Sequence, residues 1–143
     1  MLRLSNLADY AVVIMATAAR TPAGRLSATS IAQSTGVPAP TAAKLLGTLA
    51  RAGLLESARG VAGGYALARA PEAISLADVV EAVEGPIALT QCSDSESGCA
   101  MEKRCDVRPH LSIINSTVRS ALAQVSLADT ARGAPAPAPA QVI

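Results

Sequence analysis

Three cysteines are the residues of this 143-residue sequence with the clearest capacity for specific chemistry. Cys92, Cys99 and Cys105 lie within one stretch, CSDSESGCAMEKRC, and no other cysteine occurs. Thiolates bind zinc and iron–sulfur clusters, and a cluster needs them on a loop that can wrap around it. Zinc fits less well, because zinc ribbons prefer paired C-x2-C knuckles. A thiol redox switch would use only two of the three. We therefore expect a metal or redox site in a loop spanning residues 91–106.

The N-terminus bears on whether these thiols stay reduced. The apolar run of residues 11–19 follows Arg3, as in a signal peptide, but Asn6 and Asp9 interrupt its approach and Arg20 ends it. The run is also far too short to cross a bilayer. It is expected to form a buried first helix of a cytoplasmic protein without membrane contact, in which the cysteines are free thiols.

Charge is distributed unevenly along a chain whose net charge is only +1. Residues 1–70 carry a net charge of +5, residues 71–105 carry −5, and residues 106–143 carry +1. A basic first half indicates a polyanionic partner for that half, although an ordinary solvated surface explains it as well. Half of the residues are apolar, with no Phe or Trp, so we expect an aliphatic and mainly helical core.

The order of predicted elements in residues 1–90 is that of a winged helix-turn-helix. Capping residues, glycines and prolines delimit three helices, and a glycine-rich hairpin and a fourth helix follow. The predicted bounds are 5–20 after the cap Ser5, 27–35 closed by Gly36, about 39–52, strands 54–58 and 65–68, and 75–84. The fold class is therefore mainly α with a small β-hairpin wing.

The third helix has the two faces that a recognition helix needs. Its apolar face carries Leu45, Leu46 and Leu49. Its polar face is cationic and short-chained near its start, as entry into the major groove requires. Arg59, beside Gly60 on the hairpin tip, is suited to a narrow minor groove. The expected contacts to double-stranded DNA are Thr29, Pro38, Pro40, Thr41, Lys44, Thr48, Arg51, Arg59, Gly60 and Gly63. The alternatives are a solvated helix face and a protein-interaction module.

The longest helical pattern begins at Pro109 and reaches about Ala131. Its apolar residues recur at intervals of three and four, which is typical of a seam that packs on another helix. These residues are Leu111, Ile114, Val118, Leu122 and Val125. A helix of roughly 34 Å has little of its own domain to cover, so residues 107–131 are predicted to form a homodimer. Packing back on the same chain is the alternative. Residues 132–143, rich in Ala and Pro, are predicted to be a disordered tail.

Three stretches together resemble one family of winged-helix regulators. They are MLRLSNLADYAVV, VPAPTAAKLLGTLARAGLLESARGVAGGYALA and the cysteine cluster. They resemble the regulators that include IscR, NsrR and RirA, with the strongest likeness to regulators of the SUF iron–sulfur assembly genes. The resemblance implies a homodimer that binds an operator and an iron–sulfur cluster, 2Fe–2S or 4Fe–4S, held by Cys92, Cys99 and Cys105.

The resemblance also bears on the fourth cluster ligand. Arg108 stands where IscR has its histidine ligand, and IscR has one residue fewer between its first two cysteines. NsrR-like relatives use an aspartate from the first helix of the partner subunit, and Asp9 stands at that place. His110, the one histidine of the chain, is the second candidate. Asp94, Glu96 and Asp106 are within reach of the loop.

The sequence is therefore expected to encode a cluster-sensing transcription regulator that represses the SUF genes when its cluster is bound. The alternative is a nitric-oxide or thiol-redox sensor of the same fold. A lone histidine and the lack of a nucleotide-binding glycine motif or an acid–base pair argue against an enzyme, and no small-molecule substrate is expected.

Overall fold

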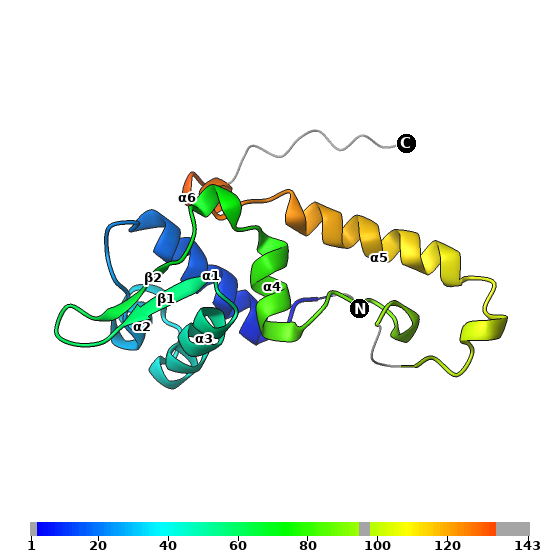
Figure 1. The fold of residues 1–143 in the computed structure, drawn as a ribbon, viewed down its shortest axis with the longest axis horizontal. Coiled ribbons are helices and arrows are strands. Elements are labelled where there is room, and N and C mark those ends of the chain that lie inside the picture. Colours follow the sequence, from blue (N-terminus) through cyan, green and yellow to red (C-terminus); the bar gives the residue numbers. More distant parts are fainter. Residues whose placement is uncertain (1–2, 95–97, 134–143) are drawn as a thin grey trace.

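A computed structural model describes residues 3–94 and 98–133 (Figure 1). Most of the elements are helices, and two short strands form a hairpin. In chain order they are α1 (Asn6–Arg20), α2 (Ala28–Thr35), α3 (Ala39–Arg51), β1 (Leu55–Ala58), β2 (Gly64–Leu67), the 3-10 turn Pro71–Ala73, α4 (Leu76–Glu84), the 3-10 turns Gln91–Ser93 and Glu102–Arg104, α5 (Arg108–Ala123) and α6 (Leu127–Ala131).

Local capping chemistry places the first helices where the sequence predicts them. The Ser5 side chain accepts a hydrogen bond from the Ala8 amide at the start of α1. Ser27 and Ser30 form a capping box at the start of α2. Gly36 ends α2 with φ +79°, the left-handed conformation that glycine adopts without steric cost. These bounds confirm the predicted first two helices.

The hairpin is anchored to the helical body by a third backbone segment. β1 and β2 pair antiparallel, with Leu55 opposite Leu67 and Ala58 opposite Gly64. Leu26, just before α2, exchanges two backbone hydrogen bonds of 2.8 Å with Tyr65. The second strand begins at Gly64, one residue earlier than predicted, because Gly64 pairs with Ala58. The wing therefore rests on the segment that leads into α2.

The core is aliphatic, as the composition predicts. It lies where α1, α3, α4 and α6 meet, and its largest fully buried side chains are Ile14, Met15, Ile31, Leu45, Leu46, Leu49, Ile74, Leu127 and Val79. The three leucines of α3 fill the side of that helix that the pattern assigned to the core. The opposite side of α3 is thereby left for solvent or for a partner.

The predicted continuous helix from Pro109 to about Ala131 is wrong in its extent. α5 ends at Ala123, and α6 is a separate helix that starts after Ser126. Ser126 forms a capping box with Asp129, and such a box begins a new helix. The backbone on either side of Ser126 also bonds back to the start of α4: the Leu76 amide donates to Val125 and the Leu127 amide donates to Ile74, both at 2.9 Å.

These bonds give the last third of the chain two different roles. α6 packs against α1 and buries Leu127 completely, so it belongs to the helical body. α5 has no fully buried residue and extends away from that body, above the loop that carries the cysteines (Figure 1). The prediction of a disordered tail falls, from residue 134 onward, outside the described residues. Among those that are described, none of the helices is long and apolar enough to span a bilayer.

Candidate nucleic-acid interface and cysteine loop

The outer face of α3 carries the cationic and hydroxyl side chains singled out in the sequence. Lys44 and Arg51 are exposed, and Thr41 and Thr48 are half-buried. The Thr48 hydroxyl donates to the Lys44 carbonyl at 3.1 Å and accepts from Arg51 Nη2 at 3.2 Å. Thr48 therefore orients Arg51 along the helix. Thr29, Pro38 and Pro40 are also exposed, on α2 and at the start of α3.

The hairpin tip has the shape that the glycines predict. Arg59, Gly60 and Val61 are exposed, and Val61 has no neighbour to cover it. The Gly63 amide donates to the Gly60 carbonyl at 2.9 Å, and a Cβ on Gly63 would lie 2.5 Å from the Ala58 carbonyl oxygen. Only glycine fits this turn. The tip therefore presents the Arg59 guanidinium on a tightly closed turn.

Arg25 is a basic residue at the wing that the sequence reasoning missed. Its Nη1 donates to the Gly64 carbonyl at 3.3 Å, and its guanidinium lies 3.8 Å from the Glu56 carboxylate. It stands in a connection between helices, where no periodicity marks it. In the sequence, Arg25 is visible only as one of the positive charges of residues 1–70.

The three cysteines lie in the connection between α4 and α5, as predicted. All are free and half-buried. Cys92 belongs to the first 3-10 turn, where its Sγ lies 3.1 Å from the Thr90 hydroxyl. The carbonyl of Cys99 accepts from Glu102, and that of Cys105 accepts from Arg108. An ion pair of 2.7 Å between Arg108 and Glu102 fastens the second turn to α5.

The donor chemistry of this loop suits an iron–sulfur cluster, because three unpaired thiols occur within one segment. The arrangement does not close a site: among residues 3–94 and 98–133, no group of three or more His, Cys, Asp or Glu could hold a metal ion. The candidate fourth ligands Asp9, in the first turn of α1, and His110, in the first turn of α5, are both exposed. Asp94 and Asp106 lie on the loop itself, and Glu96 falls outside the described residues.

The start of the cysteine loop is held on α5 by one asparagine. Asn115 Oδ1 accepts from the Leu89 amide at 2.9 Å, and Asn115 Nδ2 donates to the Ile87 carbonyl at 3.1 Å. One side chain thus satisfies a donor and an acceptor of the backbone just before Cys92. Asn115 interrupts the apolar pattern of α5, which is the signal that marks it in the sequence.

An ion pair adjoins these bonds. Arg119, one turn further along α5, donates from Nε and Nη2 to the two carboxylate oxygens of Glu81 on α4, at 2.8 and 3.2 Å. The same carboxylate accepts from the Ile87 amide at 3.5 Å. The hydrogen bond and the charge of Glu81 raise the pKa of Arg119 above its ordinary value. α4, α5 and residues 87–89 are therefore joined by one polar network.

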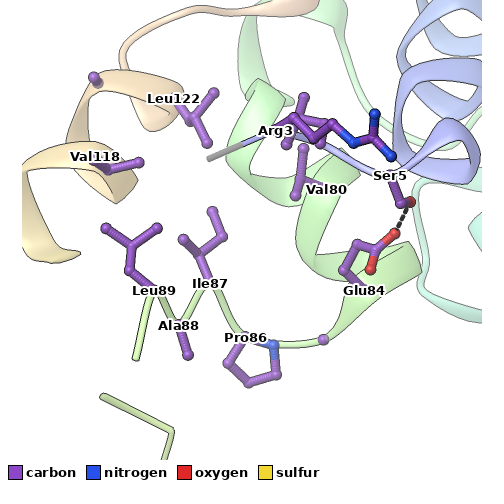
Figure 2. Close-up of a pocket in the computed structure, with 13 residues that line it drawn as sticks. Arg3, Ser5, Val80, Glu84, Pro86, Ile87, Ala88, Leu89, Val118 and Leu122 are labelled. Carbon is purple, nitrogen blue, oxygen red and sulfur yellow. Dashed lines mark hydrogen bonds between the residues drawn. The ribbon is translucent and has the colours of Figure 1, made fainter. Parts of the chain in front are cut away.

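Apolar side chains surround a groove of about 540 Å³ beside this network. Figure 2 shows Ile87, Leu89, Val118 and Leu122 around it, with Arg3 at its edge and Ser5 hydrogen-bonded to Glu84. Two residues of the predicted seam, Val118 and Leu122, therefore line a groove formed with their own chain. Leu111 is half-buried, and Ile114 and Val125 are exposed.

The comparisons with known proteins agree with this arrangement. The family model "Rrf2: Iron-dependent Transcriptional regulator" matches residues 4–133. The chain belongs to the Rrf2 family. The predicted resemblance, the mainly helical fold with a hairpin wing, and the expectation that the protein is a regulator rather than an enzyme are confirmed. It is a DNA-binding transcription regulator by family and by fold.

Individual relatives show how far the likeness extends. An HTH-type transcriptional regulator of Synechocystis is 40% identical over 84 residues, which cover 58% of this chain and 57% of that one. CymR of Bacillus subtilis is 31% identical over 85% of this chain and 90% of its own. The solved structure of that CymR, described as the global cysteine regulator, has a TM-score of 0.74 at 29% identity and covers 94% of this chain and all of that chain. The structure of T. potens IscR has a TM-score of 0.70 at 28% identity and covers 94% of this chain and 89% of that one.

Proposed function

We propose that this Rrf2 protein is a homodimeric, cytoplasmic regulator that senses an iron–sulfur cluster and represses the SUF assembly genes when the cluster is bound. One observation carries the proposal: three free, half-buried thiols occupy the loop between α4 and α5, in a chain whose α3 exposes a cationic face. The likeness to T. potens IscR supports it.

The DNA-reading role is assigned to the polar side of α3 and to the wing. Lys44 is suited to donate to guanine or to a phosphate, and the methyl and hydroxyl of Thr41 are suited to thymine. Arg51, held by Thr48, reaches the phosphate backbone, and Arg59 enters the minor groove. Thr29, Pro38 and Pro40 flank this surface, and Gly60 and Gly63 shape the wing tip.

The cluster would be held by Cys92, Cys99 and Cys105, with a fourth ligand from Asp9 of the partner subunit or from His110. When bound, it supplies an iron- and oxygen-sensitive group whose loss reports the state of the cell. The donor set fits, and the loop has to draw its three thiols together to close around it. Gly98, next to Cys99, gives the backbone at that thiol the conformational freedom for such a movement.

Regulation then follows from the loop's two attachments. Its start leaves α4, and its end enters α5, so a change in the distance between the thiols acts on both helices. α4 also packs on α1 and α3. A coupling of 1–3 kcal/mol is typical of allosteric proteins and would change operator affinity by roughly 5- to 150-fold.

A second copy of the chain is the partner proposed for α5. Ile113 and Ile114 are 63% and 50% exposed on that helix, and Met101 and Val107 are exposed on the adjoining loop. Such neighbouring apolar side chains are typical of a protein interface. A homodimer would also present two copies of α3 to a pseudo-palindromic operator.

The test begins with protein purified without oxygen. We expect iron and acid-labile sulfide in near-equal amounts, with visible absorption, and loss of both when Cys92, Cys99 or Cys105 becomes Ala. Operator affinity measured at fixed salt should fall when the cluster is removed. Colourless protein after attempted reconstitution, or equal affinity with and without the cluster, would refute the sensor proposal. Asp9→Ala and His110→Ala, compared for cluster stability, identify the fourth ligand.

A thiol-redox sensor is the second candidate, and a specific observation favours it. The described residues contain no group of three or more His, Cys, Asp or Glu that could hold a metal ion, and a solved structure of Staphylococcus aureus CymR is described as its oxidized form. Full operator binding by metal-free protein, lost on oxidation and restored by a reductant, would select this function. Loss of a bound cluster on exposure to nitric oxide would instead select the nitric-oxide sensor.

A further inference from the structure

The polar network of Glu81, Asn115 and Arg119 joins α5 to α4 and to residues 87–89, which lie more than 25 residues earlier in the sequence. Glu81 lies on α4, Asn115 and Arg119 lie on α5, and all three contact residues 87–89 or each other. We name these three residues the loop clamp. We propose that the loop clamp is the positioning device that transmits the state of the cysteine loop to the DNA-reading unit. This inference rests on the proposed function, in which the loop is the sensor.

The geometry of Asn115 makes it sensitive to the loop backbone. Its side chain is engaged at both ends, by the Leu89 amide and by the Ile87 carbonyl, so a rotation of residues 87–89 breaks at least one bond. Leu89 precedes Cys92 by three residues, and Thr90 between them contacts the Cys92 sulfur at 3.1 Å. A displacement at Cys92 therefore reaches Asn115 within a few bonds.

The ion pair between Arg119 and Glu81 links a displacement of α5 to α4. The Glu81 carboxylate receives both Arg119 and the Ile87 amide, which ties the clamp to α4. α4 is also fixed at its other end, where the Leu76 amide donates to Val125 just beyond α5. Both ends of α4 are thus tied to the α5 segment, and we expect a shift of α5 to act on α4. α4 contacts α3, and α3 carries Lys44.

Apolar side chains also line the region between residues 87–89 and α5, around an open groove. Ile87 and Leu89 face Val118 and Leu122 across the groove in Figure 2, and Val118 directly precedes the clamp residue Arg119. Beside this groove of about 540 Å³, the backbone of residues 87–89 is held by hydrogen bonds to Asn115 and Glu81.

The test uses a thiol probe, so that it does not depend on a cluster. A chain that keeps only Cys92, with Cys99→Ser and Cys105→Ser, is compared as the free thiol and as the N-ethylmaleimide adduct. The adduct is too large for the 3.1 Å contact with Thr90 and must displace residues 90–93. Affinity is measured for a duplex selected from random DNA by the unmodified protein, together with the oligomeric state.

We expect the adduct to change the affinity of the Cys92-only chain by about fivefold or more, the lower end of typical allosteric coupling. Asn115→Ala should reduce this response to less than about twofold, and Arg119→Gln should reduce it in part. Ser116→Ala, on α5, and Arg132→Gln, which removes the exposed Asp129–Arg132 ion pair, are the matched controls and should leave the response unchanged.

Two results would overturn the inference. One is an adduct response of the same size with and without Asn115. The other is no response in the Cys92-only chain itself. A merely structural role for Asn115 would lower the unfolding temperature and both affinities together, leaving their ratio intact, and would count as the first result. Iron and sulfide analysis of the three-cysteine protein tests the sensor proposal separately, because the adduct response involves no cluster.

Discussion

Lys44 and Arg51 are both exposed cations of α3, and the proposed function gives them different tasks. Arg51 is tied to Thr48 at the C-terminal end of the helix, whereas Lys44 lies in its middle, one turn after Pro40. Single side chains are expected to set the DNA sequence preference and the pH dependence of the start of α6. The sequence supplies their identities, and their neighbours supply their roles.

Lys44→Ala and Arg51→Ala should therefore weaken operator binding in different ways. A base-edge contact removed at Lys44 costs about 1–3 kcal/mol and relaxes sequence preference at one position. A phosphate contact removed at Arg51 weakens all duplexes alike and lowers the salt dependence by about one counterion. Anisotropy titrations against matched and mismatched duplexes at several salt concentrations measure both. Identical behaviour of the two variants would contradict this division.

Asp129 gives α6 a pH-dependent start. Hydrogen bonds from the Ser126 hydroxyl and amide, at 2.7 and 2.9 Å, lower the pKa of its carboxyl. A lowered pKa in the folded state stabilises the fold above the unfolded pKa of about 4, and this contribution is lost as the pH falls through the lowered value.

Asp129→Asn should thus lower the unfolding midpoint at neutral pH by an amount that shrinks toward acid. Urea unfolding of the two proteins, from neutral pH to about one pH unit below the ordinary carboxyl pKa, measures the difference. Asp106→Asn, on the exposed loop, is the control. A difference that stays constant across this range would show that the carboxylate charge plays no part.

At the scale of elements, the wing depends on a close approach between two backbones. Gly64 has φ +124°, and a Cβ there would lie 2.8 Å from the Leu26 carbonyl oxygen. The hydrogen bonds between Leu26 and Tyr65 tie the wing to the start of α2. The starts of α4 and α6 also depend on each other, because their capping residues Ser75 and Ser126 form a backbone bridge.

Gly64→Ala should displace the wing while leaving the helical core folded. Strained backbone of this kind costs of order 1–3 kcal/mol, and the loss of Arg59 placement should weaken DNA binding. Gly24→Ala is the matched control, because its Cβ would meet ordinary contacts of 3.5 Å or more and its φ is not positive. Thermal unfolding and operator titration measure the two effects. Unchanged DNA affinity in a stable Gly64→Ala protein would remove the wing from the interface.

The whole molecule consists of a DNA-reading body and a protruding α5 with the cysteine loop beneath it (Figure 1). In a single chain α5 has exposed apolar residues and no fully buried one, which is the reason for proposing a second copy as its partner. The seam predicted from periodicity is shared between two surfaces. Val118 and Leu122 line the groove of their own chain, and Ile114 is exposed at the surface proposed for a second copy.

Ile114→Glu should therefore dissociate the proposed dimer. A carboxylate placed in an apolar interface should raise the dimer dissociation constant at least about tenfold, which corresponds to 1.4 kcal/mol. Operator binding should weaken with it, because two half-sites are no longer bound together. Sedimentation measures the oligomeric state. Ser116→Glu, about 200° around the helix, is the control. A dimer that tolerates Ile114→Glu would place the interface elsewhere.

The sequence by itself determined the elements whose signals are local. Ser5, Ser27 and Ser75 cap helices through hydrogen bonds to amides three residues away, so their side chains mark the helix starts without reference to the rest of the chain. The leucine face of α3 and the glycines of the wing act over a few residues in the same way. The cysteine cluster and the quoted motifs were enough to indicate the family.

Only the tertiary structure decided what depends on segments distant in sequence. The Ser126–Asp129 capping box that begins α6 is a local signal, but the backbone bonds that hold this break against Ile74 and Leu76 are not revealed by an apolar repeat in residues 111–125. Asn115 appears in the sequence as an interruption of that repeat, and its function comes from Ile87 and Leu89, more than 25 residues earlier. Periodicity reports which face of a helix is apolar. Which neighbour covers that face is determined by the path of the whole chain.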